Sequence, residues 1–239
     1  SNFEISQTPT LSDRPLMDRW IISELNTLVQ EVDAALEDFD SQIAGRALAR
    51  FIDDLSNWYV RRSRRRFWDG DVAALGTLHE CLVTLTQLLA PLVPFITEQV
   101  WQELVIPADS KQAASVHLSN WPTVNVGAID TELASQVALT RRIVELGRAT
   151  RAESGIKIRQ PLGRALIAAS GWSTLPEAMR EQIADELNVQ TLQDIATADG
   201  DLVDISVKAN FKSLGAKFGG AVQEIAKAIA ATDATALVK

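Results

Sequence analysis

The sequence predicts a mainly α-helical protein: an antiparallel helical bundle followed by a small α+β module. First, apolar residues recur at threes and fours through most of residues 13–105. Second, Asp40, Asp69-Gly70-Asp71 and Pro91 break this stretch into four helices with short turns, the pattern of a bundle. Third, short apolar runs and strict alternation replace the helical spacing after Ile156.

The first two helices are expected over residues 13–39 and from Ser41 to about Trp68. Pro15 suits a first turn, and Asp40 or Ser41 can cap the second helix by accepting hydrogen bonds from its free N–H groups. The expected apolar face of the first helix is Leu16, Trp20, Leu25, Leu28, Val32, Ala35, Leu36 and Phe39. That of the second helix is Ile43, Leu48, Phe51, Ile52, Leu55, Trp58 and Tyr59.

A third helix is expected over residues 72–90, and "APLVPFITEQVWQEL" begins a fourth, because Pro91 and Pro94 suit a first turn. The following loop, Ile106 to Pro122, is long for a compact domain and is expected to lie across the bundle. The inward side chains expected on the third helix are Leu75, Leu78, Leu82, Leu85 and Leu89.

A connecting helix over residues 127–154, ended by Gly155, leads into the α+β module. Strands are expected in "GRALIAA", "VQTLQDIA" and "DLVDISVK", and Thr174 with Glu177 forms a capping-box signature for a helix between the first two. A last helix is expected to carry Phe218, Val222, Ile225 and Ile229. The predicted domains are 1–122 (bundle), 123–159 (connecting helix and basic turn) and 160–239 (α+β module).

The composition excludes several classes of protein. A single cysteine, Cys81, rules out a disulfide framework, and two scattered histidines cannot form the usual zinc clusters. No apolar run is read as reaching the ~18 residues of a membrane span, and the N-terminus lacks a signal-peptide pattern. We therefore expect a cytoplasmic, monomeric chain with no metal, no cofactor of its own and no membrane contact.

Positive charge is concentrated in two segments of an acidic chain. Residues 46–68 hold seven arginines against Asp53 and Asp54, a local charge of +5, and residues 141–164 also carry +5. The formal charge of the whole chain is −8, so the remainder carries −18. Such segregation indicates a polyanionic partner, although helical charge runs are also common on solvated faces.

The stretch "WYVRRSRRRFW", residues 58–68, is the strongest candidate binding site. At 100° per residue from Leu55, the centre of the buried face, Arg62 and Arg66 fall on the core side and Arg64 points away. Arginines beside aromatic rings suit RNA with unstacked bases, and the alternative is a structural ion-pair hub or a docking surface for another domain. The candidate RNA-binding residues are Arg61, Arg62, Arg64, Arg65, Arg66 and Trp68.

A second candidate lies in "GRATRAESGIKIRQPLGR". Arg148 and Arg151 are three residues apart on one helix face, and Lys157 and Arg159 are expected on one face of an extended run. Two elements would then direct these four cations to one junction. The alternative is that basic residues here cap the carboxyl end of the helix.

Three motifs, "DRWIISELNTLV", "FIDDLSNWYVRRSRRRFW" and "LLAPLVPFITEQVWQEL", followed by "SVHLSNWP", resemble the anticodon-binding helical domain of class I aminoacyl-tRNA synthetases. The resemblance is to the isoleucine, valine and leucine branch and covers nearly the whole chain. "RATRAESGIKIRQPL" and "DISVKANFKSLGAKFGGAV" resemble the isoleucyl members in particular.

The resemblance implies a parent enzyme that uses ATP to attach isoleucine to tRNA(Ile), with the bundle along the anticodon stem. The His-x-Gly-His and Lys-Met-Ser-Lys-Ser signatures of the catalytic domain do not occur in this sequence, nor does the cysteine-rich zinc module of some members. The chain is therefore expected to be a C-terminal portion without catalytic residues, partnered by tRNA(Ile) and by the catalytic domain of the same polypeptide. The alternatives are the equivalent valyl or leucyl domain and a helical protein-interaction scaffold.

Overall fold

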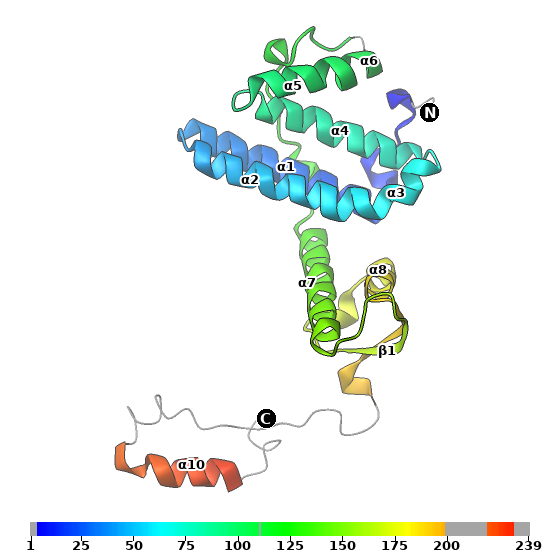
Figure 1. Cartoon of the computed structure of the whole chain (residues 1–239). Coiled ribbons are helices and arrows are strands. Elements are labelled where there is room, and N and C mark those ends of the chain that lie inside the picture. The colour runs from blue at the N-terminus through cyan, green and yellow to red at the C-terminus, as the bar shows by residue number, and fades with distance from the viewer. Residues whose placement is uncertain (1–3, 110, 199–218, 232–239) are drawn as a thin grey trace. The chain divides into compact units, whose positions relative to one another are not determined.

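The computed structural model describes residues 4–109, 111–198 and 219–231 (Figure 1). These residues are mainly helical with one small sheet, which confirms the predicted fold class. The chain divides into two compact units, Ser1–Arg142 and Ile143–Lys239. The three-domain division expected from the sequence stays a prediction, and the strand expected at 201–208 and Phe218 lie outside the described residues.

The first unit is a helical bundle (Figure 1). The helices α1 and α2 lie side by side, and α4 packs against α1. The largest fully buried side chains of the bundle include Trp20, Ile21, Leu28, Leu48, Tyr59, Leu88 and Trp101. The helices are α1 (Leu16–Glu37), α2 (Ser41–Asp53), α3 (Arg61–Trp68), α4 (Val72–Leu89), α5 (Pro94–Val100) and α6 (Ile106–Ala108).

The turn between α1 and α2 confirms one predicted cap and corrects the expected apolar faces. Asp40 caps α2, since its carboxylate accepts a hydrogen bond from Ile43 N at 2.9 Å. Phe39 was expected on the inward face, but it lies in the turn with φ of +58° and is 95% exposed. Ile43 and Ile52 are likewise exposed. Pro15 lies immediately before α1, at its cap position.

Small residues, more than leucines, form the buried face of α4. Ala74 and Cys81 are fully buried, whereas of the five leucines expected inward only Leu85 is buried. With a mean hydropathy of 1.4, Val72–Leu89 is also long and apolar enough to pass as a membrane span. This corrects the expectation that no segment of the chain reaches the length and apolarity of such a span. One such helix is weak evidence for a membrane, and α4 lies in the middle of the bundle (Figure 1).

The segment after α6 packs back on α4 and α5, as expected of the long loop. Trp101 Nε1 donates a hydrogen bond to the carbonyl of Ala113 at 2.8 Å. The carboxylate of Glu98 accepts hydrogen bonds from Ser115 Oγ at 2.7 Å and from Val116 N at 3.1 Å. Val116 thereby joins a small apolar cluster with Ala90 and Trp101.

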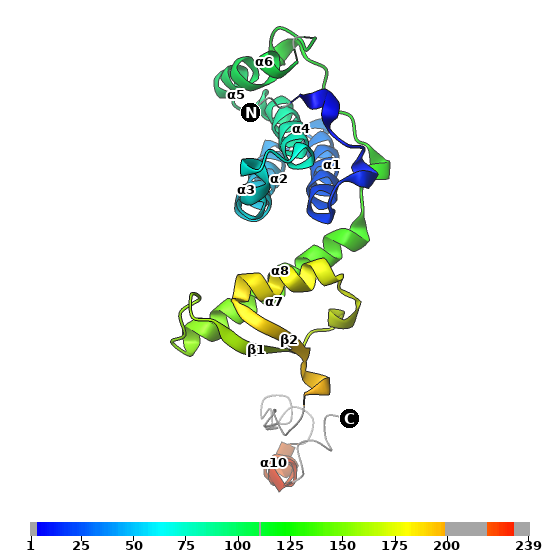
Figure 2. The same cartoon turned by 90° about the vertical axis from the view of Figure 1, so that its right-hand side faces the viewer.

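A long helix, α7 (Thr131–Glu153), runs from the first unit into the second. The second unit adds β1 (Leu162–Ile167), α8 (Glu177–Leu187), β2 (Val189–Asp194) and α10 (Val222–Ala231). The strands β1 and β2 pair in parallel, with Leu162 opposite Val189, and α8 is their crossover (Figure 2). The expected capping box is not formed, because Pro176 takes the cap position and the Thr174 hydroxyl donates to Gly171 O instead.

Candidate nucleic-acid interface

A π-helical turn, Asp54–Val60, joins α2 to α3 and changes the helical register before the arginines. Here the N–H of Arg61 donates to the carbonyl of Ser56, five residues back, where an α-helix uses the fourth. The buried face therefore continues through Tyr59 to Ser63 and not through Arg62, as the regular spacing predicted. Arg62 and Arg66 border this face and are half-buried.

Arg66 is committed to internal carboxylates. Its Nη1 and Nη2 donate to the two oxygens of Asp18 at 2.6 and 2.8 Å, and its Nε donates to Asp71 Oδ2 at 2.8 Å. Asp18 is 0% exposed and also accepts from the Tyr59 hydroxyl at 3.0 Å. Arg66 thus ties α1, α3 and the start of α4 together. For this residue the structure favours the ion-pair hub, and its place among the RNA-binding candidates stays a prediction.

The electrostatics of this hub follow from its geometry. Hydrogen bonding to Asp18 raises the pKa of Arg66, and the hydrogen bond from Arg66 lowers the pKa of Asp71. Burial raises the pKa of Tyr59, and the negative charge of Asp18 adds to the effect. Asp18 lies between Met17 and Trp20, which are both buried, and a buried carboxylate needs a cationic partner. An acidic residue among these apolar neighbours is the signal that could have indicated the ion pair from the sequence.

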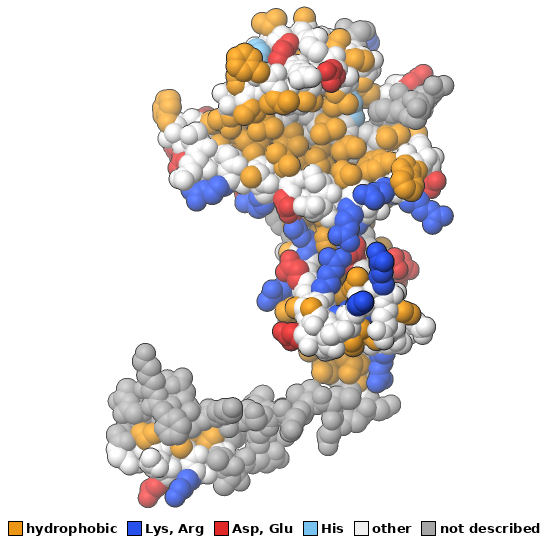
Figure 3. Space-filling model, viewed as in Figure 1, with side chains coloured by type: hydrophobic (Ala, Val, Ile, Leu, Met, Phe, Trp, Pro, Cys, Tyr) orange, Lys and Arg blue, Asp and Glu red, His pale blue; other side chains and the backbone are white. Residues whose placement is uncertain are grey.

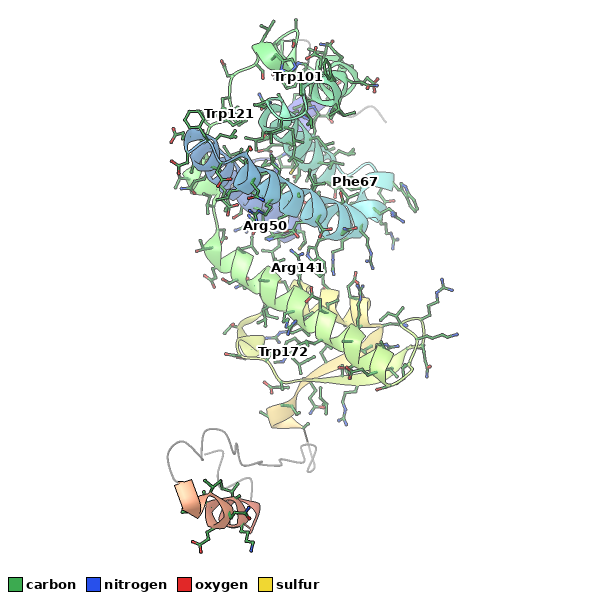
Figure 4. All side chains as sticks on the ribbon, turned by 60° about the vertical axis from the view of Figure 1, so that its left-hand side comes forward. Arg50, Phe67, Trp101, Trp121, Arg141 and Trp172 are labelled. Atoms are coloured by element: carbon green, nitrogen blue, oxygen red, sulfur yellow. The ribbon has the colours of Figure 1, made fainter. Side chains whose placement is uncertain are left out.

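Trp58 supports a second arginine contact. The guanidinium carbon of Arg62 lies 3.4 Å from the centre of the Trp58 ring, and that of Arg141 lies 5.5 Å from it. Arg141, which Figure 4 labels, also pairs through Nη1 with Asp54 Oδ1 at 2.6 Å. These contacts use cation–π attraction and a partly buried ion pair to join α7 to the π-helical turn. Sequence reasoning did not indicate that Arg141 contacts Trp58 and Asp54.

Arg64, Arg65 and Trp68 remain at the surface of α3. Arg64 is exposed and makes no ion pair or hydrogen bond within the part of the chain that the structure describes. The side chain of Arg65 is 92% exposed and contacts the exposed Asp69 at 3.9 Å, and Trp68 is 81% exposed. Arg61 is exposed too, although it interacts within the chain. Figure 3 shows basic side chains along this edge of the bundle.

The second basic segment is divided between internal and exposed groups. Arg148 pairs with Glu186 of α8, and Arg151 donates to the carbonyls of Lys157, at 2.8 Å, and of Gln160. Arg151 is only 6% exposed, so it holds the turn after α7. Lys157 and Arg159 are exposed, but they lie in a turn and not on the extended run that was predicted. Gly155, with φ of +67°, ends α7 and allows this turn.

The partly buried Glu24 on α1 has a shifted pKa, and Asp54, Arg50 and Arg141 all contribute to that shift. Burial raises its pKa above the ordinary 4.5, and Asp54 adds to this against opposing contributions from Trp20, Arg50 and Arg141. Folding therefore favours the protonated carboxyl. As the pH rises above 4.5, Glu24 ionises first in the unfolded chain, so the free energy of unfolding falls until the pH passes the raised pKa of the folded chain.

The variant Glu24→Gln is expected to unfold at a higher urea concentration than the unmodified chain at neutral pH. In acid below pH 4.5 the two should unfold together, because both side chains are then neutral. Urea titrations at the two pH values measure this difference. A variant less stable than the unmodified chain at neutral pH would show that the Glu24 carboxylate is stabilising.

The fold and this surface define a helical-bundle domain with an exposed cationic end. The chain belongs to the family of anticodon-binding domains of tRNA ligases, whose family model matches residues 18–167. Among the described residues, no group of three histidine, cysteine or carboxylate side chains could hold a metal ion.

Curated relatives extend the likeness beyond the bundle. The chain is 58% identical over 229 residues to an isoleucine–tRNA ligase of Streptomyces coelicolor, which covers 96% of this chain and 22% of that protein. It is 55% identical to the isoleucine–tRNA ligase of Thermobifida fusca, over 100% of this chain and 23% of that protein. The isoleucine–tRNA ligase of Deinococcus radiodurans is 40% identical, over 98% and 22%. The chain thus spans about a fifth of the length of these relatives.

Proposed function

We propose that this chain is the tRNA-binding part of an isoleucine–tRNA ligase and that it binds the anticodon stem and loop of tRNA(Ile). The single observation that carries the proposal is the exposure of Arg64, Arg65 and Trp68 at the end of α3, in a chain of the anticodon-binding family. The parent enzyme would attach isoleucine using ATP in a catalytic domain elsewhere in the polypeptide. This part would need no cofactor, no metal and no catalytic residue of its own.

The chemistry of the exposed groups supports RNA over other polyanions. Arg64 and Arg65 can each offer a planar set of donors to phosphate oxygens without first breaking a buried ion pair. Trp68 offers an exposed ring on which an unpaired base can stack. Lys157 and Arg159 are exposed on the second unit and would add phosphate contacts there. Arg62, Arg66, Arg148 and Arg151 would act by holding these elements in place.

Titration of labelled tRNA(Ile) with the chain at several salt concentrations tests the proposal. Affinity should fall steeply as salt rises, because phosphate neutralisation releases counterions, with a slope of about one per phosphate contact. tRNA(Val) and tRNA(Leu) are the matched competitors. Absence of binding at low salt would overturn the function, and stronger binding of either competitor would overturn the assignment to isoleucine.

A second candidate function, protein interaction, is favoured by the apolar surface of α4. Leu75, Leu78 and Leu82 are only half-buried, and Figure 3 shows a broad hydrophobic surface over α4, between α5 and the α1–α2 pair. We propose that the rest of the same polypeptide covers it, since the relatives are four to five times longer than this chain. The separately expressed catalytic part should then bind after nuclease treatment, and binding that nuclease abolishes would mean that RNA bridges the two.

A further inference from the structure

A groove of about 310 Å³ lies in the second unit between α7 and β1, which Figure 2 shows side by side. Its walls are mainly aliphatic, and Ala165 is part of the wall on β1. The wall on α7 is one stripe of the helix, because its residues recur at threes and fours: Ile143, Leu146, Gly147 and Thr150. Leu146 is 50% exposed, so the described part of the chain leaves this stripe open to solvent.

The helix α10 carries an apolar stripe with the same spacing: Val222, Ile225, Ala226 and Ile229. None of its described side chains is buried. Its charged residues, Glu224 and Lys227, lie on the opposite face, about 150° from the stripe at 100° per residue. An isolated helix shorter than about 12–15 residues is only marginally stable in water, and α10 has 10 residues. Its stability therefore calls for an apolar partner surface.

We propose that α10 seats its apolar stripe in the groove between α7 and β1. The stripes of α7 and α10 both extend over seven residue steps, about 10 Å of helix, so their lengths match. Residues 199–218 link the two parts and can span up to about 70 Å, which lets α10 reach the groove. This tether also gives α10 a high effective concentration at the groove. Glu224 and Lys227 stay in solvent on docking, so no charge is buried.

Cross-linking of engineered cysteines in the full chain is the first test. The only native cysteine, Cys81, is buried and does not interfere. Under mild oxidation Leu146→Cys/Ile225→Cys should form an intramolecular disulfide at least about tenfold faster than Leu146→Cys/Lys227→Cys, because a disulfide needs Cα atoms within about 7 Å. Electrophoresis without reductant measures both rates. Equal rates would show a tethered helix that collides without docking, and absence of both disulfides would place α10 elsewhere; either result overturns the proposal.

A double-mutant cycle is the second test, and its conservative variants keep the fold. Leu146→Ala and Ile225→Ala should each raise the unfolding equilibrium constant, and their combination should raise it by less than the product of the two factors, since contacting residues are coupled. The matched cycle of Leu146→Ala with Lys227→Ala should multiply. Urea titration measures all the variants, and a multiplying Leu146/Ile225 cycle would overturn the proposal.

The remaining polypeptide is the competing occupant of the groove. In the chain as it stands, the Ile225→Ala change should shift the nuclear magnetic resonance signals of the Leu146 and Ala165 methyl groups, and Lys227→Ala should leave them in place. If these methyl signals respond only when the separately expressed catalytic part is added, that part covers the groove and α10 does not.

Discussion

The Asp18→Ala variant is expected to lose about 3–5 kcal/mol of unfolding free energy, the cost of removing one partner of a buried ion pair. The carboxylate of Asp18 is fully buried and accepts three hydrogen bonds, two from Arg66 and one from Tyr59. Its removal leaves the guanidinium with only Asp71 and leaves the Tyr59 hydroxyl with the 3.4 Å contact to Ala74 O. Urea unfolding followed by circular dichroism measures the loss.

Asp69→Ala provides the matched control, because it also removes a carboxylate from an arginine of α3. The Arg65–Asp69 pair is exposed and 3.9 Å long, so its loss should cost no more than about 0.5 kcal/mol. The double variant Asp18→Ala/Arg66→Met should recover part of the loss, since no buried charge then stands alone. Equal stability of Asp18→Ala and Asp69→Ala would show that Arg66 reaches solvent freely and that the hub does not hold the bundle.

The double variant Arg64→Ala/Arg65→Ala is expected to weaken tRNA binding by about 10- to 100-fold at low salt, as removal of two phosphate contacts should. The slope of log affinity against log salt should fall by about two. Urea unfolding should stay within about 0.5 kcal/mol of the unmodified chain, because both side chains are exposed and neither lies in the core. Fluorescence anisotropy of labelled tRNA measures the affinity.

Lys111→Ala/Lys227→Ala removes the same charge from exposed positions on other elements and should leave the affinity within about twofold. A similar loss in both double variants would mean that the affinity follows net charge and not a defined surface. An unfolded Arg64→Ala/Arg65→Ala variant would mean that these arginines belong to the structural hub. Either result would remove the main support for the proposed tRNA contact.

The helical elements could be predicted because their signals are local. Asp40 caps α2, Asp69-Gly70-Asp71 separates α3 from α4, and Gly155 ends α7, each at the position that the sequence indicated. The buried face of α4 was predicted less well, because leucine was preferred over alanine and cysteine. Apolar spacing marks which residues can be buried, but the partner helix decides which of two neighbouring stripes faces the core.

The arginine cluster shows the same limit. The sequence indicated that arginine enters the inward stripe, and Arg66 does so with carboxylate partners. It did not indicate the π-helical turn Asp54–Val60. The regular spacing therefore predicted Arg62 on the buried face, at the place that Ser63 occupies in the structure. It also did not indicate that Asp18, forty-eight residues away, receives Arg66. A long-range ion pair leaves no periodic pattern in the sequence. Only the packed bundle therefore shows which arginines are paired with carboxylates and which remain exposed.

The sequence by itself determined the class of fold, the ends of most helices and the two places where positive charge collects. Hydrogen-bonding needs at helix ends and the spacing of apolar residues act over a few positions, so they can be read along the chain. The tertiary structure alone decided that Arg66 and Arg151 are held inside while Arg64 and Arg65 face solvent. The physical reason is that the desolvation and pairing of a charge depend on groups brought together from distant positions of the chain.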